Sequence, residues 1–321
     1  MDEETISCVL CTYCGERYIE EQLDSIASQT LSPSEIIVCD DRSDDNTLAY
    51  VREFAVKNSG IAVRIHKNKK QLGPVKNFEQ GLRLATGKYI AFSDQDDVWK
   101  PYKLEKSVAR IKELENEYGE NTPVLVHTDL EVVDEGLHQI AASLFHHQGI
   151  YHVQGRHAQI NTLLAQNFAT GCTEVMNQSL KRAMLPFPEH VIMHDYWAAL
   201  VAACTGAIGY VGDQSIKYRQ HGDNTVGASK YISLVSLHKL LHIKKVFKKL
   251  SDTIVQDREL LHYKNGKIAK DCPEVADFLR IIDERNAFAA LFSPTHKQGI
   301  LRDVLYHIML AFYTVGANRS S

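Results

Sequence analysis

The stretch YIAFSDQDDVWKP, residues 89–101, joins an apolar run to a cluster of carboxylates. The run Tyr89–Phe92 has the length and character of the end of a buried strand, and Asp94, Asp96 and Asp97 follow it at once. Carboxylates so close together repel one another and raise one another's pKa, so the cluster requires water, a cation or a basic partner. A strand that ends in such a loop is typical of the ligand-binding edge of an α/β sheet.

The segments before this stretch alternate between short apolar runs and helical patterns. Strands are predicted over residues 6–13, 35–41, 62–68 and 89–95, and helices over 17–29, 46–58 and 75–87. This order predicts an α/β fold, a mostly parallel doubly wound sheet with helices on both faces. Ligands bind such sheets beyond the carboxyl ends of the strands, here at Thr12–Arg17, Asp40–Asn46 and Asp94–Asp97.

The pattern changes in the second half of the chain. We expect a helix over 103–118, a strand over 123–134, a mobile His-rich loop over 136–159, ordered structure over 171–184, a helix over 194–206 and a strand pair over 207–221. From Lys230 onward the pattern predicts helices only. We therefore place a domain boundary near residue 228, which divides the chain into a catalytic domain, 1–228, and a helical C-terminal appendage, 229–321.

The composition is that of an ordinary soluble globular protein. The chain has 321 residues, of which 44% are apolar and 24% charged, and its net charge of −4 gives no reason to expect a nucleic-acid partner. Seven cysteines without a tight framework, and no leader-like pattern at Met1–Glu4, favour a reducing, cytoplasmic location. No run reaches the roughly 18 apolar residues of a spanning helix, so we expect no membrane crossing.

Asp94 and Asp96 are candidate metal ligands. Two carboxylates two residues apart at a strand end can address one hard divalent cation, and Mg²⁺ and Mn²⁺ prefer oxygen ligands. The alternative is a solvated acidic turn. Trp99 and Pro101 argue against it because they make the segment stiff and packed, and buried unpaired acids are costly. A cation that bridges diphosphate oxygens would offset that cost.

Acids at two other positions each have two interpretations. Asp40 and Asp41 end the second predicted strand, where they can cap the next helix or accept hydrogen bonds from a pyrimidine base or a ribose. Asp195 begins a helix, where it can stabilise the helix N-terminus or act as a general base toward an acceptor hydroxyl. The sequence leaves both pairs open, and we interpret His194 as structural.

Two basic segments follow. KYRQHGDN, residues 217–224, places Arg219 and His221 at the end of a strand, where they either neutralise a diphosphate or complete a metal shell, or belong to an ordinary edge strand. The segment Lys230–Leu250 has six lysines, no acid and helically spaced apolar residues. Such a basic amphipathic helix either packs on the catalytic domain or docks on an anionic membrane surface.

Taken together, four stretches resemble family 2 glycosyltransferases with the glycosyltransferase A fold. They are CTYCGERYIEEQLDSIASQTLSPSEIIVCDDRSDDNT, QLGPVKNFEQGLRLATGKYIAFSDQDDVWKP, HDYW and YRQHGDN, and the resemblance covers roughly residues 5–227. Their combination in this order is more specific than any one of them. One departure is Arg42, which stands where that family usually has a glycine.

The resemblance assigns roles to individual residues. By position it implies nucleotide contacts, a metal-binding Asp-x-Asp pair, a catalytic base and a closing segment at the diphosphate. The nucleotide residues are Thr12, Glu16, Asp41, Asp94 and Gln95; the metal ligands for Mg²⁺ or Mn²⁺ are Asp94, Asp96 and His221; the base is Asp195; and the diphosphate contacts are Arg219 and His221.

The implied reaction is a single inverting displacement from a nucleoside-diphosphate sugar, dTDP-rhamnose or a UDP-sugar, to a hydroxyl of a glycan or lipid-linked glycan. The overall likeness is to bacterial enzymes of surface-polysaccharide synthesis, which places the protein in the cytoplasm or on the inner face of the cell membrane. The alternatives are a sugar nucleotidyltransferase and a non-catalytic protein that binds nucleotide sugars or glycans. The C-terminal appendage could serve as a membrane-surface contact or a homo-oligomer contact.

Overall fold

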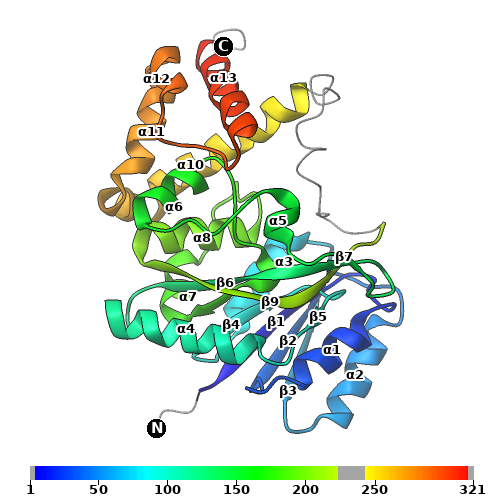
Figure 1. Ribbon diagram of the computed structural model, residues 1–321. Helices are drawn as coiled ribbons and strands as arrows, with labels where there is room; N and C mark the ends of the chain where they lie inside the picture. Colours follow the sequence, from blue (N-terminus) through cyan, green and yellow to red (C-terminus); the bar gives the residue numbers. More distant parts are fainter. Residues whose placement is uncertain (1–3, 223–242, 317–321) are drawn as a thin grey trace.

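The computed structural model describes residues 4–222 and 243–316. A single mixed β-sheet with helices on both faces makes up most of the molecule, and four further helices, α10 to α13, extend from one side of it (Figure 1). The strand order is β3-β2-β1-β4-β8-β6-β9-β5, and β7 pairs with β6. The predicted α/β fold with helical C-terminal segments is confirmed.

The first four strands form the parallel half of the sheet. They are β1 (Ile6–Thr12), β2 (Glu35–Asp40), β3 (Ala62–Lys67) and β4 (Tyr89–Ser93). The register pairs Thr12 with Asp40, and Leu10 with Ser93. The carboxyl ends of β1, β2 and β4 therefore meet at one edge of the sheet, as the sequence predicts.

Alternate residues of these strands face two separate cores, because successive side chains of a strand point to opposite faces. Cys8 and Leu10 pack with the helices on one face, whereas Val9 packs with those on the other. The first face is covered by α1 (Ile19–Ala27), α2 (Thr47–Lys57) and α4 (Lys103–Tyr118), and the second by α3 (Pro74–Leu84) and later helices. The continuous apolar runs of the strands follow from this burial on both sides.

The second half of the sheet is antiparallel where it joins the first. β8 (Val175–Asn177) pairs antiparallel with β4 and with β6 (Val124–Val133). β9 (Ala207–Arg219) runs parallel to β6, and β5 (Val98–Trp99) closes the edge. The predicted strand pair over 207–221 is wrong: Gly212 and Asp213 lie in a shift of register within one strand, because the bulge bends β9 without reversing it.

The expectation of a mobile loop over 136–159 is also wrong. This stretch contains β7 (Gln139–Ala141), α5 (Leu144–Gln148) and the start of α6 (Arg156–Leu163). His127 of β6 approaches His152, with 3.0 Å between its Nε2 and the His152 Nδ1, and aromatic rings pack around the pair. The polar histidines of this stretch had suggested a loop in solvent. His152 instead packs against other rings inside the fold.

Helices α6, α7 (Gln178–Met184) and α8 (His194–Thr205) complete the second face of the sheet. α8 is buried along nearly its whole length, from Tyr196 to Cys204, in keeping with its run of small and apolar residues. Its first turn lies next to the short helix η1 (Gly171–Thr173). The N-terminus of a rigid buried helix is thereby fixed near the carboxyl edge of the parallel strands.

The C-terminal helices share a core with the part of the molecule that contains the sheet. They are α10 (Ile243–Asp271), which is interrupted at Tyr263–Gly266, α11 (Pro273–Asp283), α12 (Ala287–Leu291) and α13 (Ile300–Gly316). Tyr263 packs edge-on against Trp197 of α8, and its hydroxyl donates to the carbonyl of Pro186 at 2.7 Å. The predicted boundary near residue 228 and most of the predicted basic helix lie outside the described residues, so both stay predictions.

Gly206 sits where α8 turns into β9, and it permits the closest backbone approach of this region. A Cβ added to Gly206 would lie 1.9 Å from the carbonyl oxygen of Pro123. We expect Gly206→Ala to lower the free energy of unfolding by on the order of 3 kcal/mol, because backbone on both sides must shift. Urea denaturation measures this change.

The matched control is Gly60→Ala, where an added Cβ meets nothing within 4 Å. We expect its unfolding free energy to stay within about 0.5 kcal/mol of the wild type. Equal stability of the two variants would contradict the close packing of α8 on the segment before β6.

Candidate active site

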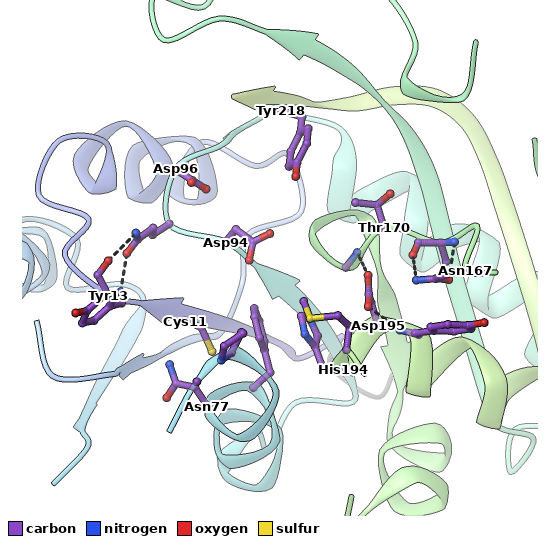
Figure 2. Close-up of a pocket in the computed structure, with 18 of the residues that line it drawn as sticks. Cys11, Tyr13, Asn77, Asp94, Asp96, Asn167, Thr170, His194, Asp195 and Tyr218 are labelled. Carbon is purple, nitrogen blue, oxygen red and sulfur yellow. Dashed lines mark hydrogen bonds between the residues drawn. The ribbon is translucent and has the colours of Figure 1, made fainter. Parts of the chain in front are cut away.

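A pocket of about 500 Å³ opens at the carboxyl edge of the parallel strands. One side, here called the strand wall, comes from residues between Cys11 and Asp96; the other, the helix wall, comes from residues between Leu144 and Tyr196. Figure 2 shows Asp94 and Asp96 on the first side, and Asp195 with Thr170 on the second. The predicted residues Thr12, Asp41, Asp94, Gln95, Asp96 and Asp195 all line this pocket.

The turn after β4 concentrates negative charge. Burial raises the pKa of Asp94 to about 7, with further contributions from the charges of Asp96 and Asp195. Burial and the charges of Asp96 and Asp94 raise the pKa of Asp97 well above its usual range. The sequence predicted such mutual repulsion, and the fold increases it by removing the acids from water.

Arg219 and His221 hold this turn from the end of β9. The Arg219 guanidinium donates to the backbone carbonyl of Asp96 at 2.9 Å and also pairs with Glu21. His221 Nε2 lies 2.8 Å from Oδ2 of Asp96, and the imidazole packs against the ring of Tyr18. Neither residue lines the pocket, but both contact the acid that does.

Two acids of this turn also belong to a second group of potential metal ligands. One ligand atom each of Asp94, Asp97 and Cys172 falls within 4.8 Å of the others. Asp97 is fully buried and accepts the Arg219 backbone N–H at 3.2 Å, while burial keeps the pKa of the Cys172 thiol well above its usual range. A protonated thiol is a poor ligand for Mg²⁺ or Mn²⁺. We therefore interpret this group as buried packing of the turn and not as a metal site.

Asp41 is held rigidly in the strand wall. Its Oδ1 accepts hydrogen bonds from Asn68 Nδ2 (2.9 Å) and the Leu72 N–H (2.7 Å), and its Oδ2 accepts one from the Gly73 N–H (2.8 Å). A carboxylate offers about four lone-pair sites, so Oδ2 keeps one for a ligand. Asp40, in contrast, binds Thr12 Oγ1 and the Ser43 backbone within the protein.

Three predicted nucleotide residues have hydrogen-bond partners within the protein. The Gln95 amide forms two hydrogen bonds with the Tyr13 backbone, at 2.8 and 3.0 Å, and so joins the loops after β4 and β1 (Figure 2). Glu16 lies outside the pocket lining and accepts from the Asn46 backbone N–H at 2.9 Å, at the start of α2. Thr12 donates its hydroxyl to Asp40 at 3.0 Å.

Asp195 faces the pocket from the first turn of α8. Its Oδ2 accepts the Gly171 N–H at 3.1 Å and its Oδ1 accepts the Tyr196 N–H at 2.6 Å. Burial raises the pKa of Asp195 to about 6, although these two N–H groups favour the charged form. A carboxylate with a pKa near neutrality is suited to accept a proton from a hydroxyl group.

His194 is a pocket residue that the sequence analysis interpreted as structural. Its ring stacks on Phe78 with 3.7 Å between the centroids, and among the described residues neither ring nitrogen has a hydrogen-bond partner. Burial lowers the pKa of His194 to about 3, which keeps the imidazole neutral. The sequence signal that could have identified His194 as a pocket residue is its position directly before Asp195. Most of the helix wall, including Gln148, Asn167 and Met193, was also missed.

Comparisons with known proteins agree with this architecture. The profile of the family described as Glycosyl transferase family 2 matches residues 7–176. An uncharacterized glycosyltransferase of Haemophilus influenzae is 28% identical over 223 residues, which are 68% of this chain and 67% of that protein. The dTDP-rhamnosyl transferase RfbG of Shigella flexneri is 27% identical over 270 residues, which are 77% of this chain and 85% of RfbG.

A third relative matches over a shorter range. The UDP-Glc:alpha-D-GlcNAc-diphosphoundecaprenol beta-1,3-glucosyltransferase WfgD of Escherichia coli is 34% identical over 109 residues, 34% of this chain and 42% of WfgD. Among solved structures, S. aureus TarS 1–349 in complex with UDP-GlcNAc superposes with a TM-score of 0.55 and 19% identity, over 89% of this chain and 75% of that one. At this identity the likeness to TarS concerns the fold alone.

Proposed function

The chain belongs to glycosyl transferase family 2, and on that premise we propose that it is an inverting transferase that moves a sugar from a nucleoside diphosphate to a glycan hydroxyl. The observation that carries the proposal is the placement of Asp94 and Asp195 on opposite walls of one pocket. A sugar between them would have its diphosphate at the acidic turn and its anomeric carbon open to attack from the side of Asp195.

We infer a pyrimidine nucleotide as the donor, dTDP or UDP. Uracil and thymine each carry one imide N–H, and the remaining acceptor site on Asp41 Oδ2 suits such a donor group. Two relatives have pyrimidine nucleotides in their names: dTDP in RfbG and UDP-Glc in WfgD. Rhamnose and hexose donors are both compatible with this argument.

A divalent cation, Mg²⁺ or Mn²⁺, fits the turn after β4. The turn offers hard carboxylate oxygens on Asp94 and Asp96, and the His221 imidazole lies 2.8 Å from the Asp96 carboxylate. Burial and the charges of Asp96 and Asp195 raise the pKa of Asp94, so a bound cation would favour its charged form. When bound, the cation would neutralise charge on the departing diphosphate. Arg219 fixes the turn through the Asp96 carbonyl and thereby orients both acids.

The proposed chemical step has one proton transfer and one displacement. Asp195 accepts the proton of the acceptor hydroxyl, the hydroxyl oxygen forms a bond to the anomeric carbon, and the bond from that carbon to the diphosphate breaks. The nucleoside diphosphate leaves with the electron pair, and the anomeric configuration inverts. The N–H groups of Gly171 and Tyr196 hold the Asp195 carboxylate in place for this role.

For the acceptor we propose a glycan or a lipid-linked glycan of a bacterial surface polysaccharide. WfgD is named for transfer to a sugar on diphosphoundecaprenol, and RfbG for transfer of rhamnose. The helix wall would bind this acceptor, because it carries Asp195 and lies across the pocket from the acidic turn.

The first test is a thermal-shift panel of UDP, dTDP, GDP and CDP, each with and without Mn²⁺. We expect UDP or dTDP to raise the melting temperature, and the cation to enlarge the rise, because nucleotide and cation would stabilise the folded state jointly. Equal shifts with all four nucleotides would contradict the role of Asp41. No shift with any of them would contradict the donor class.

The rate of transfer is expected to depend on pH through Asp195. Only the carboxylate can accept a proton, so kcat should fall about tenfold per pH unit below the Asp195 pKa of about 6 and level off above it. Rates between about pH 5 and 8, with saturating donor and Mn²⁺, measure this profile. A flat profile would contradict the assignment of Asp195 as the base.

A further inference from the structure

Large apolar side chains are exposed on α12, on α13 and directly between them. Of the sixteen large apolar side chains that are exposed among the described residues, ten lie between Phe288 and Val315. Ile300 is 83% exposed, Phe288 75% and Phe292 73%. We call this set the α12–α13 apolar face; its members are Phe288, Leu291, Phe292, Ile300, Leu301, Val304, Leu305, Ile308, Phe312 and Val315.

The spacing along α13 shows that this face is continuous. At 100° per residue, its seven members on α13 fall within an arc of about 140°. The buried residues Tyr306, Leu310 and Thr314 fall on the opposite side, where α13 packs on the core. The polar residues Arg302 and Asp303 lie outside the arc, so the exposed arc is apolar throughout.

Helix α12 extends the same surface. α12 and α13 contact each other and stand side by side at the end of the molecule farthest from β3 (Figure 1). The rings of Phe288 and Phe292 lie 5.1 Å apart, between centroids, and both are exposed. Contiguous apolar patches of this kind mark interaction surfaces in soluble proteins.

Positive charge lies at the same end of the molecule. Lys244, Lys245, Lys248 and Lys249 are all exposed in the first turns of α10, and the first acid of that helix is Asp252. Figure 1 shows the start of α10 at the end of the molecule that carries α12 and α13. A partner that covers both features would offer an apolar interior and negative charge.

We propose that this end of the molecule docks on the surface of an anionic lipid bilayer. The α12–α13 apolar face would enter the boundary between headgroups and acyl chains, and the α10 lysines would contact lipid phosphates. None of the described helices is long and apolar enough to cross a membrane. A second copy would present the same lysines, so it would not offer them the negative charge that an anionic bilayer offers.

The test is flotation of the full chain with phosphatidylcholine vesicles, with and without phosphatidylglycerol. We expect Ile300→Ser/Phe312→Ser to weaken partitioning at least tenfold, because two exposed apolar side chains lose their burial in lipid. The matched control is Val56→Ser/Tyr118→Ser, which removes two side chains that are 83% and 55% exposed on other helices. The control pair should partition within about twofold of the wild type.

The role of the lysines, and a second copy of the chain as the alternative partner, are tested separately. Lys244→Glu/Lys248→Glu should abolish the preference for phosphatidylglycerol vesicles, and added salt should weaken wild-type binding. Equal partitioning of the wild type and the Ile300→Ser/Phe312→Ser variant would overturn the proposal. A dimer that light scattering detects without vesicles, and that this variant dissociates, would assign the face to a second copy instead. The proposal does not depend on the reaction, so failed flotation with intact sugar transfer would reject the surface alone.

Discussion

Asp195→Asn is expected to lower the rate of sugar transfer about 10³-fold while nucleotide binding and the fold remain. The general base contributes typically 10²–10⁴ in rate, and an amide cannot take the acceptor proton. Asn can still accept the N–H of Gly171 or Tyr196, and the loss of charge removes a buried carboxylate whose pKa is raised to about 6. Initial rates of transfer and calorimetric titration with the nucleotide measure the two quantities.

The control separates catalysis from helix stabilisation. Glu105 is also an acid in the first turn of a helix, α4, but it lies outside the pocket lining. Glu105→Gln should leave the rate unchanged and cost at most about 1 kcal/mol of stability. If Asp195→Asn lost nucleotide binding together with transfer, Asp195 would be structural. If it retained the wild-type rate, another group would be the base.

Asp96→Asn is expected to reduce transfer by about 10³-fold at a fixed Mn²⁺ concentration. Stabilisation of charge by a metal ion contributes several kcal/mol, and about 1.4 kcal/mol corresponds to a factor of ten. Asp96 carries the carboxylate that His221 approaches to 2.8 Å, so its loss alters one of the polar contacts that the end of β9 makes with the turn. The rate as a function of Mn²⁺ concentration is the measurement.

The expected signature is a shift of the Mn²⁺ response to higher concentration together with a lower maximum. Asp303→Asn is the control, because Asp303 also lies near a histidine, 3.5 Å from His307, but belongs to α13. This variant should keep the wild-type Mn²⁺ response. A normal Mn²⁺ response with Asp96→Asn would remove Asp96 from the proposed metal site.

The parallel half of the fold was predictable because its signals are local. Strands such as β1 and β4 are buried on both sides, so their sequences are short apolar runs. In the helices between them, apolar residues recur with the period of a helix. The family resemblance is confirmed by the same region, residues 7–176. The antiparallel entry of β8 was not predictable, since three residues carry too little pattern to show direction.

The strand wall of the pocket was predictable for the same reason. Asp41 and Asp94 come directly after buried strands, and parallel strands end at a common edge. The helix wall comes from segments whose placement depends on tertiary packing. His194 illustrates the limit: its role follows from the stack on Phe78, a residue more than a hundred positions earlier in the chain.

Arg42 has a left-handed backbone conformation at the position where the sequence analysis noted a departure from the family pattern. Its φ of 72° lies in the left-handed region, where glycine has no steric penalty and other residues cost roughly 1–2 kcal/mol. The Asp40 carboxylate accepts the Ser43 N–H at 3.0 Å and closes the turn around Arg42. The usual glycine is thus a conformational preference that this turn overcomes with a side-chain hydrogen bond.

The two walls of the pocket come from consecutive parts of the sequence. The whole strand wall precedes α4, the helix wall lies between Leu144 and Tyr196, and Tyr218 of β9 is a further lining residue. A recombination event within α4 would therefore let a descendant inherit one half of the specificity and replace the other. The C-terminal helices would have to travel with the second half, because α8 shares their core. Under the proposed function, such an exchange would let a lineage keep its nucleotide-sugar donor while its acceptor changes.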